Sequence, residues 1–114
     1  MNGMVAARGL IMFFLFMCPL FGIAGNQSGK VALFVARASD GLHYFVLEGT
    51  PQNRPSCASA SSYFMIKNEN SPVGRTQIAM VMAAYAAGKP IGVAGSNTCT
   101  RWGDGEDVDV IQNF

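Results

Sequence analysis

The sequence predicts a small α+β domain, mainly β, with elements in the order β-β-β-α-β-β. Two observations favour this class. Short apolar runs separated by Gly, Pro, Asn and Ser predict strands, and one Ala- and Met-rich segment between the third and fourth runs predicts a helix. This element order is that of an OB-like five-stranded barrel. An open antiparallel sheet with one helix packed on it has the same order, so both architectures stay open.

The first 24 residues predict a secretory signal peptide. Arg8 supplies a positive charge, and the stretch from Gly9 to Phe21 is apolar and uncharged. An apolar run of about 13 residues suits a signal-peptide core, whereas a membrane-spanning helix needs roughly 20. Gly22 and Ala24 are small residues at the two positions that a signal peptidase reads. We therefore expect cleavage near Ala24–Gly25 and a secreted or periplasmic bacterial protein without a membrane span.

The remaining residues, 25–114, are enough for one small domain. They contain two cysteines, Cys57 and Cys99, and an even number in an exported domain predicts a disulfide. The bond would close a loop of about 42 residues and stabilise the fold by roughly 4 kcal/mol. Lipidation at Cys18 is the alternative form of processing, but bulky Met17 beside it fits poorly where a small residue is wanted.

The first half of the domain is expected to form three strands. A polar start at 26–29 precedes a strand over 30–37 that is apolar on both faces. Ser39-Asp40-Gly41 predicts a hairpin turn, because glycine tolerates the positive φ of tight turns. A second strand follows over 42–48. A proline-containing loop then ends at Cys57, and a third strand is expected over 63–67.

The second half is expected to contain one helix and two short strands, over 75–87, 91–94 and 108–111. Gly88 is a suitable C-terminal cap for the helix. Apolar residues at three- and four-residue spacing predict the face that covers the sheet: Ile78, Val81, Met82 and Tyr85. Small residues form a neighbouring stripe that permits close approach and leaves a homo-oligomer open: Ala79, Ala83, Ala86 and Ala87.

Charge argues against nucleic acid and anionic membranes as partners. Without Arg8 the domain has seven Lys and Arg against seven Asp and Glu, so it is formally neutral. An acidic cluster lies near the C-terminus, at Asp104, Glu106, Asp107 and Asp109. Its spacing does not match an EF-hand loop, and we interpret it as a solvated turn and strand edge without a metal.

No catalytic constellation can be assembled from the residues present, so we expect no enzyme and no cofactor. His43 is the only histidine, and it lies inside the second predicted strand. With the cysteines bridged, no serine stands in a Gly-x-Ser-x-Gly context. A structural or surface role for His43 is the favoured interpretation.

Aromatic and arginine side chains are the candidates for a recognition surface, because they stack on sugars or on partner side chains. Tyr44 and Tyr63 belong to strands, and Trp102 lies in the glycine-rich turn 102–105. The predicted ligand-binding residues lie in loops: Arg54, Arg101, Trp102 and Asp104. The alternative for Trp102 is a place in the core.

Between about residues 41 and 100 the chain resembles the secreted binding subunits related to subtilase cytotoxin and pertussis-like toxins. The resemblance rests on the segments 44–49 (Tyr-Phe-Val-Leu-Glu-Gly), 63–66 (Tyr-Phe-Met-Ile) and 83–90 (Ala-Ala-Tyr-Ala-Ala-Gly-Lys-Pro), with Cys57 and Cys99. It implies an OB-like fold, a signal peptide, an intrachain disulfide, ring-shaped oligomers and glycan binding.

The leading functional hypothesis is therefore an exported, non-enzymatic binding module for a glycan or a protein partner. The alternative is a periplasmic structural or inhibitory protein without a small ligand.

Overall fold

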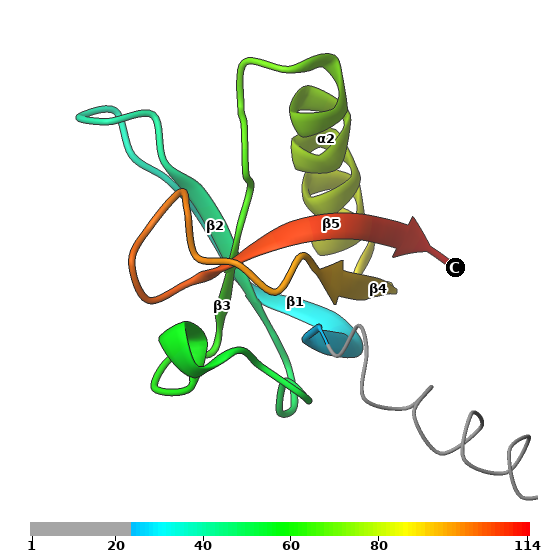
Figure 1. Cartoon of the computed structure of the whole chain (residues 1–114). Helices are drawn as coiled ribbons and strands as arrows, with labels where there is room; N and C mark the ends of the chain where they lie inside the picture. The colour runs from blue at the N-terminus through cyan, green and yellow to red at the C-terminus, as the bar shows by residue number, and fades with distance from the viewer. Residues whose placement is uncertain (1–23) are drawn as a thin grey trace, which may run out of the picture.

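The computed structural model describes residues 24–114, which form a closed five-stranded barrel with strand order β1-β2-β3-β5-β4 (Figure 1). The strands are β1 (Asn26–Ala36), β2 (His43–Leu47), β3 (Tyr63–Met65), β4 (Pro90–Gly95) and β5 (Glu106–Asn113). A 3₁₀ turn, η2 (Ser56–Ala58), precedes β3, and the helix α2 (Pro72–Ala87) joins β3 to β4. The structure therefore confirms the barrel with one helix. The expected signal peptide lies outside the described residues apart from Ala24.

Strand β1 is shared between two partners. Its first half pairs with β4, from Asn26 opposite Ala94 to Lys30 opposite Pro90, and its second half pairs with β2. A register shift between Val31 and Leu33 separates the two halves, and such irregularities bend strands. The expectation of a polar, non-strand start at 26–29 is wrong, because backbone pairing with β4 does not require apolar side chains.

Parallel pairing of β3 with β5 closes the barrel. Phe64 lies opposite Glu106, and Met65 lies opposite Asp107. The other neighbouring strands are antiparallel. Strand β5 begins two residues earlier than expected from sequence, because the two acidic residues at its start take part in this pairing.

Helix α2 has well-formed ends. The Ser71 hydroxyl accepts a hydrogen bond from the Gly74 amide at 2.9 Å, and Pro72 occupies the first turn. Gly88 ends the helix in the left-handed conformation, with φ of 64°. Gly74 is required for close packing, because a Cβ there would lie 1.8 Å from the Asn68 carbonyl oxygen.

The face of α2 that covers the barrel differs from the predicted one. Its buried residues are Gly74, Gln77, Val81 and Ala84, and Ile78 and Met80 pack partly against the core. Met82 and Tyr85 are instead 55% and 57% exposed. The prediction was wrong for these two because α2 contacts β1, β4 and β5 along a stripe rotated from the most hydrophobic one.

The barrel interior is filled by large apolar side chains from all five strands. Phe45 and Phe64 are fully buried, with ring centroids 5.9 Å apart, and aliphatic residues surround them. Among residues 24–114, no helix is long and apolar enough to cross a lipid bilayer.

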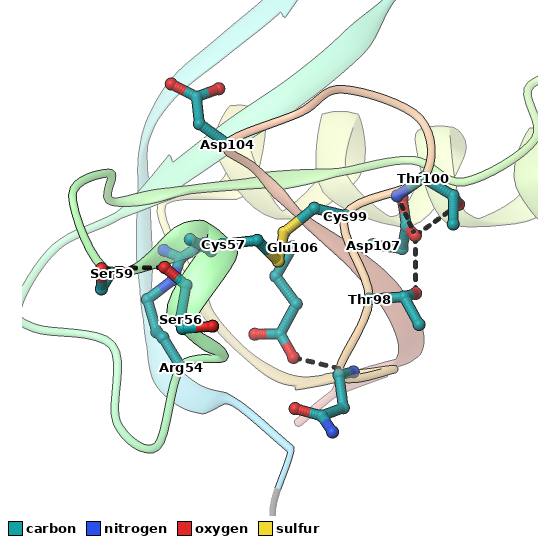
Figure 2. The surroundings of a disulfide bond; sticks show 12 residues. Arg54, Ser56, Cys57, Ser59, Thr98, Cys99, Thr100, Asp104, Glu106 and Asp107 are labelled. Atoms are coloured by element: carbon teal, nitrogen blue, oxygen red, sulfur yellow. Dashed lines mark hydrogen bonds between the residues drawn. A yellow bond between two sulfur atoms is a disulfide. The ribbon is translucent and has the colours of Figure 1, made fainter.

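The predicted disulfide is present. Cys57 of η2 is bonded to Cys99, which lies in the loop between β4 and β5, and their Cα atoms are 6.3 Å apart (Figure 2). The bond therefore joins the segment before β3 to the segment before β5.

Candidate ligand-binding site

Two loops and two strands surround a small pocket. The β1–β2 loop (residues 37–42) and the β4–β5 loop (residues 96–105) extend from the same side of the barrel (Figure 1). A pocket of about 180 Å³ lies there, lined by Arg37, Leu42, Tyr44, Tyr63, Met65 and Trp102. In OB folds the face of strands 2 and 3, together with these two loops, binds oligonucleotides and oligosaccharides.

Two tyrosines form part of the pocket wall. The rings of Tyr44 and Tyr63 are tilted against each other with centroids 5.2 Å apart. The Tyr63 hydroxyl donates a hydrogen bond to the Asp104 carboxylate. Burial and this hydrogen bond raise the pKa of Tyr63 to about 12, so the hydroxyl keeps its proton at neutral pH.

Trp102 stands at the pocket rim, 41% exposed, and is therefore not a core residue. The Arg37 guanidinium carbon lies 4.7 Å from the centroid of its ring, within cation–π distance. Asp40 holds the guanidinium with two hydrogen bonds, 2.5 Å to Nη2 and 3.3 Å to Nε. This pairing lowers the pKa of Asp40, so the carboxylate stays ionised. The pocket thus presents an aromatic ring beside a positioned cation.

Arg101 has a bracing position. Its Nε lies 3.1 Å and 3.0 Å from the two Glu69 carboxylate oxygens, and its Nη2 donates to the Asp40 carbonyl at 3.1 Å. Burial raises the pKa of Glu69, but hydrogen bonds from Arg101 and from backbone amides outweigh it and hold the pKa below its ordinary value. Arg101 therefore joins three loops rather than pointing freely into solvent.

His43 has the structural surroundings expected for it. Its Nδ1 lies 2.8 Å from the Gly41 carbonyl oxygen, and its amide donates to Glu69 at 3.1 Å. These contacts fix the turn between β1 and β2.

Arg54 is half-buried, so its expected exposure is wrong. It donates hydrogen bonds to the carbonyls of Ser61 and Tyr63, at 3.1 Å and 2.5 Å, and its guanidinium carbon lies 4.7 Å from the Phe64 ring centroid. These two carbonyls, just before β3 and at its first residue, hold the side chain inward. It does not line the pocket that Trp102 lines.

The acidic cluster is also not the solvated edge expected from sequence. Asp109 and Asp104 are exposed, but Glu106 and Asp107 are fully buried. No group of three or more potential metal-ligating side chains occurs in residues 24–114. Strand pairing with β3 draws the two buried carboxylates into the barrel wall.

Asp107 organises the β4–β5 loop. Its carboxylate accepts hydrogen bonds from the Thr98 hydroxyl, the Thr100 hydroxyl and amide, and the Arg101 amide, at 2.6–3.0 Å (Figure 2). Burial raises the pKa of Asp107, but these donors outweigh it and lower the pKa overall. The residue before Trp102 is thereby tied to the barrel.

Of the residues selected from sequence, the pocket is lined by Tyr44, Tyr63 and Trp102, and Asp104 is hydrogen-bonded to Tyr63. Arg101 braces the neighbouring loops, and Arg54 lies elsewhere. Arg37 is the charged pocket residue that the sequence did not single out. Its signal is its place at the end of the first strand, three residues before the aspartate of the hairpin turn.

No family model, curated protein or solved structure matches this chain.

Proposed function

We propose that this protein is an exported, non-enzymatic binding module whose pocket beside Trp102 takes a glycan. The observation that carries the proposal is the half-exposed Trp102 ring beside the Asp40-held Arg37, at the loop surface that OB folds use for ligands. The toxin-binding-subunit resemblance supports the same ligand class. In this proposal export removes residues 1–24.

The chemistry of the pocket fits a sugar. An indole face packs against the apolar C–H face of a pyranose, while charged and hydroxyl groups exchange hydrogen bonds with its hydroxyls. Arg37 lines the pocket and can donate, and Asp104, which is hydrogen-bonded to the pocket residue Tyr63, can accept. Pockets for drug-sized ligands occupy about 300–1,000 Å³. A volume of about 180 Å³ therefore suits a single sugar ring at the end of a glycan.

The test compares Trp102→Ala with Tyr85→Ala, an exposed aromatic outside the pocket. We expect Trp102→Ala to weaken glycan binding by about 1–3 kcal/mol, the range of an anchor residue, with little change in thermal stability. Tyr85→Ala should bind as the wild type does. A glycan array followed by calorimetry with the best glycan, and thermal melts of all three proteins, provide the measurements.

Equal binding by the wild type and Trp102→Ala would contradict the pocket assignment. A glycan array without any bound sugar would contradict the glycan class itself. N-terminal sequencing of exported protein tests the processing: we expect Gly25 as the first residue, and a lipid-modified N-terminus at Cys18 would contradict it.

The second candidate is a structural or inhibitory protein of the periplasm that contacts another protein. Two exposed apolar residues of α2 favour it, because Met82 and Tyr85 are neighbours on the helix surface and are each more than half exposed. Substituting Met82 and Tyr85 by serine should then abolish the protein contact, whereas Trp102→Ala should leave it intact. Cross-linking in the periplasm measures this.

A further inference from the structure

Glu106 is a buried carboxylate whose hydrogen bonding is incomplete. It is 0% exposed, and its Oε2 accepts from the amides of Gly25 and Asn97, both at 3.0 Å. Its Oε1 has no hydrogen-bond partner within residues 24–114. A buried acceptor normally has one, and a buried charge is normally paired. Something that completes Glu106 is therefore expected.

No cation described in the structure completes it. The ion pairs within 4 Å in residues 24–114 join Arg37 to Asp40 and Arg101 to Glu69, and His43 Nδ1 lies 3.8 Å from a Glu69 oxygen. Arg54, in the segment before η2, attracts the Glu106 carboxylate, but it is not among these pairs. Asp107, the next residue of β5, is satisfied by its own donors, as described above.

The first residues of the domain pack closely against the Glu106 carboxylate. A Cβ at Gly25 would lie 2.0 Å from Glu106 Oε1, and a Cβ at Gly95 would lie 2.2 Å from Glu106 Cδ. Gly25 is buried, and its carbonyl accepts from the Gly95 amide at 2.8 Å. Two glycines therefore leave room for the carboxylate beside the Gly25 nitrogen, and the unpartnered oxygen lies on the Gly25 side.

The Gly25 nitrogen has a different chemistry before and after cleavage. In the uncleaved chain it is an amide with one N–H. Hydrolysis of the Ala24–Gly25 peptide bond consumes one water, leaves a carboxylate on Ala24 and gives Gly25 an α-ammonium group. That group carries a full charge and three N–H donors, enough to reach both oxygens of Glu106.

We propose that Glu106 is the built-in receptor for the new N-terminus: removal of the leader at Ala24–Gly25 creates a buried ion pair between the Gly25 ammonium and the Glu106 carboxylate. The inference rests on the cleavage site of the proposed function, and it makes processing a step that stabilises the barrel. It does not depend on glycan binding.

The ion pair has a defined pH dependence. An α-ammonium ordinarily has a pKa of about 7.7–8.0, and a buried carboxylate beside it raises that pKa. The added stability is therefore complete below the ordinary pKa and is lost as the pH rises through the raised one.

The experiment uses two chains, and each is prepared in a wild-type form and as the Glu106→Gln variant. One is residues 25–114, which contain all strands, the helix and the disulfide. The other has Ala24 and a neutral extension before Gly25. At pH 6.5 we expect Glu106→Gln to lower the melting temperature of the first chain by about 4–8 °C or more, the shift that 1 kcal/mol gives in a domain of this size. In the extended chain the same substitution should leave the melting temperature unchanged or raise it.

Two further measurements keep the proposal falsifiable. Acetylation of the Gly25 amine in the 25–114 chain should lower the melting temperature as Glu106→Gln does, without changing any side chain. NMR titration should give the Gly25 amine a pKa above its ordinary range, returning toward about 7.7–8.0 in Glu106→Gln. Asp109→Asn, an exposed acid on the same strand, is the matched control and should change neither quantity.

Equal loss of stability in both chains would overturn the inference, because Glu106 would then serve only the amide N–H. An unshifted Gly25 amine would overturn it as well. Sequencing that gives a first residue other than Gly25 would overturn the processing step and leave the pocket beside Trp102 to be judged by its own binding assay.

Discussion

Two adjacent residues of β5, Glu106 and Asp107, begin the strand in opposite situations. Both are fully buried carboxylates. Asp107 receives four hydrogen bonds from the loop that leads to Trp102, whereas Glu106 receives two backbone hydrogen bonds and keeps one oxygen unpartnered within the described chain. The hydrogen bonding of the Asp107 carboxylate is therefore satisfied by the folded domain itself. The Glu106 carboxylate has capacity for a further donor that residues 24–114 do not supply.

The two carboxylates stabilise different parts of the domain. The Asp107 side fixes the β4–β5 loop and hence the rim of the pocket, and so serves the proposed ligand site. The Glu106 side adjoins Gly25 and so serves the entrance of the chain into the barrel. The disulfide lies between these regions, because Cys99 belongs to the loop that both carboxylates anchor.

Breaking the disulfide, which anchors the loop that both carboxylates contact, should have the largest effect on stability. Cys57→Ser should lower the free energy of unfolding by roughly 2–5 kcal/mol, because it releases the loop constraint on the unfolded chain. Urea unfolding without reductant measures the loss, and Ser59→Ala on the neighbouring exposed turn is the control. Mass spectrometry that finds two free thiols in exported protein would refute the bridge.

Removing the charge of Asp107 should have the next largest effect. Asp107→Asn leaves the Thr100 amide facing an NH₂ group, and we expect a loss of about 2–4 kcal/mol at pH 7 from weakened charge-assisted hydrogen bonds. Because folding lowers the pKa of Asp107, its stabilisation is present above the unfolded value of about 3.9 and is lost as the pH falls through the folded value.

The stability difference between the wild type and Asp107→Asn should therefore become smaller as the pH falls below about 3.9. Urea midpoints at pH 7 and pH 3 decide this. A difference that stays constant between the two pH values would show that the charge of Asp107 contributes nothing.

Filling the space around Glu106 should have the smallest of these effects. Gly95→Ala places a methyl group against the carboxylate and should cost about 1–3 kcal/mol, the range for overpacking. Gly103→Ala, in the loop near Trp102, meets nothing within 4 Å and should change stability by less than about 0.5 kcal/mol. Thermal melts compare the two, and equal losses would mean that the carboxylate moves aside without cost.

The sequence predicted the fold well where local chemistry decides. The hairpin at Asp40-Gly41, the helix before Gly88 and the Cys57–Cys99 pair follow from turn chemistry, propensity and cysteine count. The element order predicted either a closed barrel or an open sheet. It could not decide between them, because the parallel pairing of Phe64 with Glu106 joins residues far apart in the chain and has no local signature.

Side-chain surroundings were predictable only in part. An exposed tryptophan in a glycine-rich turn is a local signal, and Trp102 is exposed as that signal suggests. The burial of Glu106 and the inward turn of Arg54 depend on tertiary hydrogen bonds. The density of acidic residues around Glu106 and the loop position of Arg54 therefore predicted exposure for both. The same holds for Met82 and Tyr85, since the stripe of α2 that meets the barrel is chosen by packing rather than by hydrophobicity.

The divided pairing of β1 affects the order in which the barrel can fold. Residues 31–36 pair with β2 across a short hairpin. In contrast, Asn26 pairs with Ala94, 68 positions later in the chain, and contacts of such separation form slowly. Until then the edge of residues 26–30 that later meets β4 is unpaired, and unpaired strand edges are surfaces on which chains aggregate. The sequence of this segment, Asn-Gln-Ser-Gly-Lys, is polar and ends in a charged residue. Such a sequence disfavours pairing between copies of the chain at this edge. The polar start of the domain thus protects the chain from aggregation until β4 pairs with β1.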